Sequence, residues 1–299
     1  MKATDFPLHP GNYGIPTREE LIEHRIWDSH YHGFMAGGSL SGHAATMFYV
    51  ERMGIERVIA LDIAGGSGAR SRGGPAPFLA IENQQKEIHE KESGRVSGII
   101  RIDPTKPEDS CRKIEQWIRN GPCIGIKYSG GAPTGVTCSH PNNDAIVKLC
   151  KELSAVIYIH TWIKVGGNPR FPGGGNNGSE STPMDVAILA KRFPDVPMIC
   201  GHSGGDWELG ARAIRSCENV YFEFSGSDPH SGEVDYAVNE LGADRIVWGG
   251  HGPSRSYATE LSKVFDSNLN KADRIKVFGA NYRRMAAPIF KQKGYALKM

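Results

Sequence analysis

The sequence lacks several features that would place it in a specialised class of protein. Its charge is balanced, with 35 lysine and arginine residues against 33 aspartate and glutamate residues. No field of one sign is expected, so the composition gives no support to a nucleic-acid partner. No apolar run approaches the length that crosses a membrane, and residues 1–14 contain no apolar signal-peptide core. We therefore expect a cytoplasmic protein that binds neither membranes nor nucleic acids.

Paired cysteines and phosphate-binding loops are also missing. The six cysteines lie far apart with no Cys-x-x-Cys spacing, which indicates reduced thiols that mostly fill the core. Residues 65–74 (GGSGARSRGG) are rich in glycine but match neither the dinucleotide-binding nor the Walker pattern. We interpret them as a loop between a strand and a helix, and residues 166–181 as a long loop of an active site.

What the sequence does contain is a regular alternation of short apolar runs and helical segments. Runs rich in valine and isoleucine are typical of strands buried on both faces, as in a parallel sheet. The predicted strands are 25–30, 57–63, 95–103, 123–129, 155–161, 196–203, 219–225 and 245–251. The predicted helices between and after them are 42–54, 76–94, 106–121, 142–154, 181–193, 205–217, 232–242 and 254–267.

This alternation predicts an α/β fold, a single-domain (β/α)8 TIM barrel over residues 1–299. Residues 1–24 would form an N-terminal arm and residues 268–299 a C-terminal helical extension, broken near Gly279. The length of 299 residues is ordinary for one such barrel. A doubly wound open sheet is the alternative, because the order of the strands is invisible in the sequence.

Histidines gather at the predicted strand ends. His30 and His32 follow the first strand, His160 closes the fifth, His202 the sixth and His251 the eighth. Side chains alternate along a strand, so His30 and His32 point to the same side. A lone histidine at a strand end is more often a hydrogen-bonded or surface residue. Five at the end of the barrel where active sites lie predict a divalent metal centre.

Cationic and aromatic residues follow the same strand ends. Guanidinium groups match carboxylates, so the arginines favour an anionic small-molecule substrate, although any single loop arginine is more often solvated. An indole in the same region would form an apolar wall or pack its own loop. The candidate substrate-binding residues are Lys127, Arg70, Arg72, Trp162, Arg170 and Arg255.

Five segments spread over nearly the whole chain carry a family resemblance: WDSHYHG, GIKYSGG, IYIHTW, MICGHSGG and GANYRRM. With them the chain resembles the amidohydrolase superfamily, in particular the branch that includes aminocarboxymuconate semialdehyde decarboxylase. The resemblance implies a (β/α)8 barrel with one divalent metal ion, most often zinc, with manganese or another divalent metal as the alternative. It implies His30, His32 and His160 as ligands, and His202 as a further ligand or a residue that polarises substrate or water. Homo-oligomers are common in this family.

The chain departs from the family at the eighth strand. That strand usually ends in Gly-Ser-Asp or Gly-Thr-Asp, whereas WGGHGPSR places His251 at the position of the aspartate. The aspartate supplies negative charge and takes a proton from metal-bound water, which a neutral imidazole does not do in the same way. His251 is then itself a ligand or base, or a nearby carboxylate replaces the aspartate, or hydrolytic function has been lost. Glu223 is the strongest such carboxylate, ahead of Asp228, Asp103 and Asp62.

The leading function predicted from these residues is metal-dependent hydrolysis of a small, anionic cyclic ester, lactone or amide. Metal-bound water would attack the carbonyl, His202 would orient the electrophile, and His251 or Glu223 would handle the proton. Three alternatives stay open. They are a non-oxidative decarboxylase of a carboxylated substrate, a metal-free lactonase, and a catalytically impaired barrel that only binds a ligand.

Overall fold

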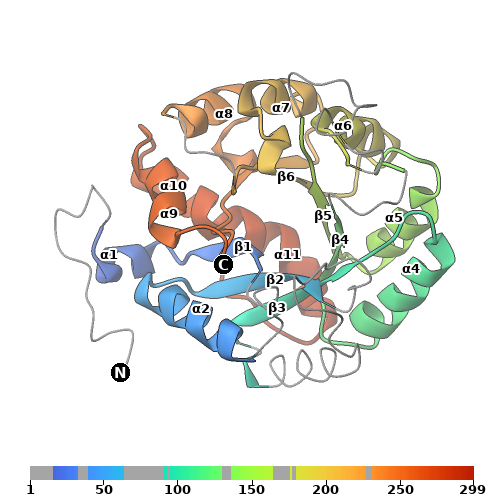
Figure 1. Ribbon diagram of the computed structural model, residues 1–299, viewed down its shortest axis with the longest axis horizontal. Helices are drawn as coiled ribbons and strands as arrows, with labels where there is room; N and C mark the ends of the chain where they lie inside the picture. Colours follow the sequence, from blue (N-terminus) through green and yellow to red (C-terminus); the bar gives the residue numbers. More distant parts are fainter. Residues whose placement is uncertain are drawn as a thin grey trace.

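The computed structural model describes residues 16–32, 40–63, 91–92, 94–129, 136–163, 176, 180–226 and 231–299. Eight parallel strands in these ranges pair with one another in chain order. They are β1 (Trp27–Tyr31), β2 (Arg57–Ile63), β3 (Val96–Arg101), β4 (Gly125–Tyr128), β5 (Val156–His160), β6 (Met198–Gly201), β7 (Val220–Glu223) and β8 (Ile246–Val247). The backbone N–H of Ser29 donates to the carbonyl of Trp248 at 3.2 Å and so brings the first strand against the last. The predicted (β/α)8 barrel is confirmed, as the central ring of strands in Figure 1 shows.

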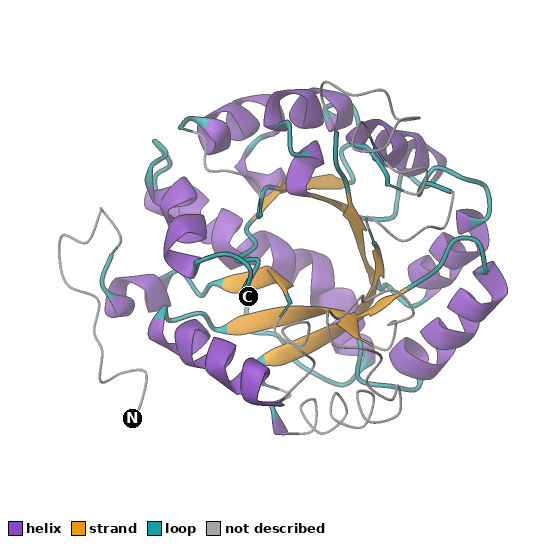
Figure 2. Cartoon of the chain, in the orientation of Figure 1, coloured by secondary structure: helices purple, strands orange, loops and turns teal. Residues whose placement is uncertain are grey.

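The strands are apolar because both of their faces are covered. In β5 the side chains of Val156, Ile157 and Ile159 are buried, and so is the ring of Tyr158. Alternation along the strand turns one set toward the helices and the other into the barrel. Figure 2 shows the helices arranged around the ring of strands. Polar residues of the inward set are therefore held inside a closed cylinder.

The helices of the outer layer follow the predicted segments closely, except α1, which lies in the segment predicted as an N-terminal arm. They are α1 (Arg18–Glu23), α2 (Leu40–Arg52), α4 (Pro107–Ile114), α5 (Asn143–Glu152), α6 (Pro183–Arg192), α7 (Trp207–Ile214), α8 (Glu233–Leu241) and α9 (Tyr257–Phe265). Thr182 caps α6 by accepting from the backbone N–H of Asp185, and Pro183 occupies the first turn. The predicted helix 76–94 lies almost wholly outside the described residues. No helix in the described ranges is long and apolar enough to cross a membrane.

The C-terminal segment packs against the N-terminal end of the barrel. It consists of α10 (Lys271–Ile275), the π-helical turn η5 (Lys276–Ala280) and α11 (Asn281–Gln292). The ring of Trp27, at the start of β1, lies 6.0 Å from the ring of Tyr282 and 5.9 Å from that of Phe290. A Cβ on Gly279 would come within 2.4 Å of a backbone carbonyl beside β1, so glycine permits this approach. The helical region is continuous through Gly279, so the predicted break there was wrong and the irregularity is a π-helical turn.

The sequence placed the ends of several strands too late, and the ends of β6 and β8 are the ones that bear on the site. β6 stops at Gly201 and β8 at Val247, so His202 and His251 lie beyond the strands and do not close them. Both histidines have left-handed backbone conformations, with φ of 60° and 50°. That conformation cannot continue a strand, because β residues require negative φ. The predicted end of β6 was wrong for this reason, whereas β8 already ends at Val247, before His251 is reached.

Candidate metal centre and active site

Three of the predicted histidines converge at the C-terminal end of the barrel. The Nε2 atoms of His30 and His32 lie 2.6 Å apart. The ring of His251 is centred 4.3 Å from that of His30 and 4.8 Å from that of His32. One nitrogen from each of the three lies within 4.8 Å of the others. Imidazoles gathered at this distance suit coordination of one divalent cation.

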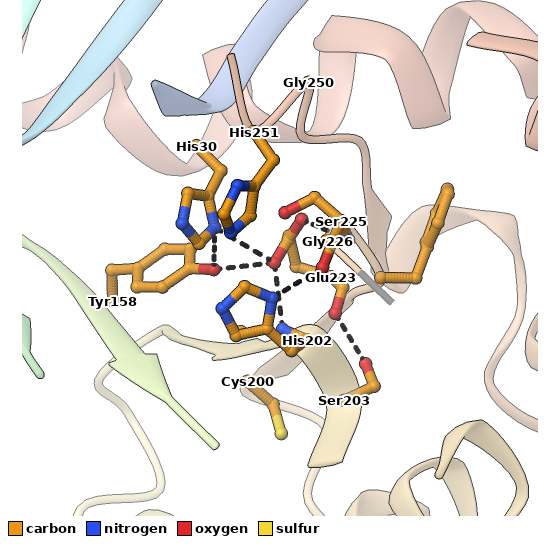
Figure 3. Close-up of polar contacts among 12 residues, drawn as sticks. His30, Tyr158, Cys200, His202, Ser203, Glu223, Ser225, Gly226, Gly250 and His251 are labelled. Carbon is orange, nitrogen blue, oxygen red and sulfur yellow. Dashed lines mark hydrogen bonds and ion pairs between the residues drawn. The ribbon is translucent and has the colours of Figure 1, made fainter. Parts of the chain in front are cut away.

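A second group of potential ligands shares His30 with the first. It consists of His30, His202 and Glu223, again with one donor atom from each within 4.8 Å of the others. The ring of His202 is centred 4.7 Å from that of His30 and 5.2 Å from that of His251. His202 therefore lies beside His30 and His251, as Figure 3 shows, and these three rings together with His32 form the histidine cluster.

His160 lies at the side of the histidine cluster, next to His202. Its ring is centred 4.7 Å from that of His202, and its Nε2 lies 3.6 Å from a carboxylate oxygen of Glu180. It also stacks on Trp162, with ring centres 6.4 Å apart. His160 belongs to neither of the two donor groups found among the described residues. Its role as a ligand remains a prediction, while its place beside His202 is established.

The buried imidazoles of His30 and His202 and the partly buried imidazole of His251 are held in their neutral forms. Burial lowers the pKa of His30 and of His202 well below the ordinary value, and lowers that of His251 to about 3. Neighbouring histidines and the ammonium group of Lys127 lower these pKa values further. A metal ligand must be unprotonated at the coordinating nitrogen, so this environment suits metal binding.

Glu223 is the carboxylate at the centre of the site. It is fully buried, and its Oε2 accepts from the hydroxyl of Tyr158 at 2.6 Å and from the backbone N–H of His202 at 3.0 Å. Its Oε1 accepts from the backbone N–H of Ser225 at 2.7 Å. The Nδ1 of His30 lies 3.6 Å from Oε2. These contacts make Glu223 the anchor for several surrounding groups.

The other carboxylates considered from the sequence are placed differently. Asp103 accepts from the backbone N–H and hydroxyl of Thr105, and so stabilises a loop. Asp228 and the side chain of Asp62 lie outside the described residues. Among the described candidates, Glu223 alone contacts the histidine cluster.

Sequence reasoning missed a second buried carboxylate, Asp28. Its Oδ1 accepts from the backbone N–H groups of His30 at 2.9 Å and Gly250 at 2.6 Å. Its Oδ2 accepts from the hydroxyl of Tyr257 at 3.1 Å. Burial raises the pKa of Asp28 to about 6. The sequence did contain a signal for Asp28. It precedes His30 by two residues in β1, and residues two apart in a strand point to the same side.

The loop after β8 is shaped to present His251. The hydroxyl of Ser254 donates to the carbonyl of His251 at 2.9 Å, and the Nδ1 of His251 contacts the same hydroxyl oxygen. The backbone N–H of His32 donates to the carbonyl of Gly252 at 2.7 Å. A Cβ on Gly226 would come within 2.5 Å of the His251 ring, so only glycine leaves room for it. His251 is therefore positioned by both β1 and the loop after β7.

Three of the six candidate substrate-binding residues are described. Lys127 is buried in β4, with its Nζ 5.8 Å from the ring centre of Tyr158. Trp162 packs edge to face with His202 at 5.9 Å. Arg255 donates to the carbonyl of Gly226, at 2.9 Å from Nη2, so its guanidinium is tied to the loop after β7. Arg70, Arg72 and Arg170 lie outside the described residues.

Comparison with known families agrees with this geometry. Residues 63–285 match a family model described as Amidohydrolase. Because this match spans more than half of the chain, the protein belongs to the amidohydrolase family, and the resemblance inferred from the sequence is confirmed. A search of curated proteins found no match.

Solved structures with the same fold come from several bacteria. A putative amidohydrolase from Staphylococcus aureus is 16% identical, with a TM-score of 0.65 over 88% of this chain and 98% of that one. The 5-carboxyvanillate decarboxylase LigW from Sphingomonas paucimobilis is 15% identical, with a TM-score of 0.63 over 85% of each chain. A dihydroxybenzoic acid decarboxylase from Polaromonas, with bound manganese and the inhibitor 2-nitroresorcinol, is 14% identical, with a TM-score of 0.63 over 88% of this chain and 96% of that one. At these identities the likeness concerns the fold.

Proposed function

We propose that the protein is a metal-dependent, non-oxidative decarboxylase of a small aromatic carboxylic acid. Similar folds include decarboxylases of 5-carboxyvanillate and of a dihydroxybenzoic acid, the latter with manganese bound. This proposal replaces hydrolysis as the leading function. It makes manganese a stronger candidate for the cation than the sequence alone suggested, with zinc as the alternative.

The observation that favours decarboxylation over hydrolysis is that both carboxylate oxygens of Glu223 already accept hydrogen bonds. Hydrolysis by metal-bound water requires a base for the proton of that water, commonly a carboxylate. Both oxygens of Glu223 accept hydrogen bonds from Tyr158 and from backbone amides. Both oxygens of Asp28 are likewise engaged, and His251 stands at the position of the family aspartate. A reaction that needs no activated water fits this arrangement better.

The converging histidines would hold the cation. His30, His32 and His251 offer neutral nitrogens that fit a divalent ion such as Mn²⁺ or Zn²⁺. When bound, such an ion would supply a positive charge that orients an anionic substrate and stabilises the charge that develops during reaction. The remaining coordination positions would be left for substrate.

Lys127, Trp162 and His202, which lie around the histidine cluster, would bind substrate and move a proton. The ammonium of Lys127 would pair with the carboxylate, and the indole of Trp162 would flank the ring of the substrate. His202 donates from Nδ1 to the carbonyl of Ser225 at 2.5 Å, so its Nε2 keeps a lone pair and would relay to the substrate a proton taken up from solvent. In the reaction the bond from ring carbon to carboxyl carbon breaks, and carbon dioxide leaves. The electron pair stays on the ring carbon, which takes one proton, so neither water nor an oxidant is consumed.

A panel assay tests this proposal. The full chain is stripped with a chelator and reloaded with Mn²⁺ or Zn²⁺ before incubation with hydroxylated benzoic acids, lactones and cyclic amides. We expect release of carbon dioxide from an aromatic acid, lost in His32→Asn and retained in His140→Asn, which alters an exposed histidine. Acid release from a lactone or amide without carbon dioxide would overturn the proposal in favour of hydrolysis.

Hydrolysis of a cyclic ester, lactone or amide is the second candidate. The description of the matched family favours it. In that case His251, whose imidazole lies in the cluster, would take the proton of water, but its pKa of about 3 makes it a weak base and disfavours this reaction. The same panel distinguishes the two reactions.

A further inference from the structure

A buried tyrosine connects the histidine cluster to Glu223. The hydroxyl oxygen of Tyr158 lies 2.5 Å from the Nδ1 of His30 and 2.6 Å from the Oε2 of Glu223. All three side chains are fully buried. A Cβ on Gly201 would come within 2.3 Å of the same hydroxyl, so the neighbouring strand leaves just enough space for it. Figure 3 shows Tyr158 between His30 and Glu223.

The number of available protons decides the direction of these hydrogen bonds. A phenol has one proton to donate and a carboxylate has none. Each oxygen of Glu223 already accepts from a backbone N–H, of His202 or of Ser225, and a backbone N–H can only donate. The hydroxyl of Tyr158 therefore donates to Glu223. Its oxygen is then the acceptor for the remaining contact, and the Nδ1 of His30 must carry the proton.

We propose that Tyr158 and Glu223 form a positioning pair that keeps the proton of His30 on Nδ1. The other nitrogen, Nε2, then keeps its lone pair and, in the metal-free chain, accepts a hydrogen bond from the Nε2 of His32 at 2.6 Å. The orienting partner of a ligand histidine sets which nitrogen is available to a metal. Tyr158 thus prepares His30 for a cation without touching the cation or the substrate.

Glu223 extends the same control to His202. The carbonyl of Ser225 can only accept, so His202 donates to it from Nδ1 and likewise leaves Nε2 unprotonated. Glu223 fixes this pair by accepting from the backbone N–H of both residues. The carboxylate that the sequence suggested as a proton carrier is therefore a positioning residue.

The opposite arrangement makes a distinct prediction. If Glu223 were protonated and donated to Tyr158, the tyrosine would donate to the Nδ1 of His30, whose proton would then lie on Nε2. The two arrangements place the proton on different ring nitrogens. Nitrogen-15 NMR of histidine-labelled protein separates them, because protonated and unprotonated ring nitrogens have well-separated shifts.

The test uses the full chain freed of metal by a chelator, with its fold checked by circular dichroism. We expect the wild-type protein to carry the His30 proton on Nδ1, the signals being assigned by their loss in His30→Asn. In Tyr158→Phe the Nε2-protonated form should appear, because Nδ1 has lost its acceptor. In Glu223→Ala the hydroxyl of Tyr158 is released and should donate to Nδ1, which moves the histidine proton to Nε2. Tyr128→Phe is the control, since Tyr128 is buried in the neighbouring strand and its hydroxyl has no hydrogen-bond partner among the described residues.

Titration with Mn²⁺ by calorimetry gives a second readout, which rests on the proposed metal site. Loss of a partner that orients a ligand histidine typically weakens metal binding about 10–100-fold, and we expect this for Tyr158→Phe but not for Tyr128→Phe. A wild-type proton on Nε2, or a His30 signal unaffected by Tyr158→Phe, would overturn the inference. If either variant fails to fold, the wild-type spectrum still shows which ring nitrogen of His30 carries the proton. A wild-type protein with the expected tautomer that binds no divalent metal would instead refute the proposed function.

Discussion

Asp28 in β1 accepts a hydrogen bond from the backbone N–H of Gly250, the residue before His251, at 2.6 Å. This contact joins the first strand to the loop that follows the last. Asp28 also accepts from the backbone N–H of His30, so one carboxylate holds the backbone on both sides of the histidine cluster. The closure of the barrel and the geometry of the metal centre therefore depend on the same side chain.

Replacing Asp28 by Asn should make folding stability less dependent on pH. Burial raises the pKa of Asp28 to about 6 in the folded chain. The folded state then holds a proton that the unfolded state has released, so stability falls as pH rises from about 4 through 6. Asp28→Asn lacks this loss of stability. Its free energy of unfolding, relative to that of wild type, should therefore rise by ~3 kcal/mol as the pH rises from about 4 through 6. Chemical denaturation of metal-free protein at both ends of the window measures the difference, and a constant difference would contradict the pKa assigned to Asp28.

The buried histidines have the opposite dependence on pH. Their pKa values are lowered in the folded state, to about 3 for His251, so the unfolded chain binds more protons at pH 5 than the folded chain. Stability therefore falls as pH falls below about 6.5, by roughly 1.4 kcal/mol per pH unit for each such histidine. Between pH 6 and 4.5, His251→Asn should remove the contribution of one histidine, which is one bound proton, from the slope of unfolding free energy against pH. His140→Asn, at an exposed site, serves as the control, and equal slopes in both variants would show that His251 is not held neutral.

Gly201→Ala should disturb the site through Tyr158. The new Cβ would lie 2.3 Å from the tyrosine hydroxyl, which must move and release Glu223 or His30. We expect a loss of ~1–3 kcal/mol in unfolding free energy, as for other overpacked cores, together with weaker binding of Mn²⁺. Gly94→Ala is the matched control, because a Cβ there would have no atom of the described part of the chain within 4 Å. If Gly201→Ala binds Mn²⁺ as tightly as wild type does, the position of Tyr158 does not depend on the space that Gly201 leaves.

His251→Asp and His251→Ala should change metal affinity in opposite directions. Aspartate adds a negative charge to a set of neutral ligands and tolerates the left-handed backbone at this position. We expect tighter Mn²⁺ binding by about tenfold in the aspartate variant, and binding weaker by about tenfold in the alanine variant, which removes a ligand. Calorimetric titration measures both. If neither substitution alters affinity, His251 is not part of the metal centre.

Much of the barrel could be predicted from the sequence because burial on both faces leaves a direct pattern. The run VIYIH predicted β5, and the alternation around His30 and His32 correctly placed both imidazoles on one side. The early ends of β6 and β8, and the backbone of His202 and His251 beyond them, could not be predicted in this way. Their left-handed conformations are held by contacts with Glu223 and Ser254, which are not local patterns of apolar residues.

The sequence by itself determined the alternation of strands and helices, the family, and the residues that are chemically able to bind a metal. These properties follow from side-chain type and from spacing along the chain. Only the tertiary structure decided which donors meet, because strands distant in sequence come together when the cylinder closes. It placed His251 with His30 and His32, left His160 to the side, and engaged Glu223 with Tyr158 and two backbone amides. Whether a carboxylate carries a proton or holds its neighbours in place is set by which donors surround it, and those donors come from separate strands.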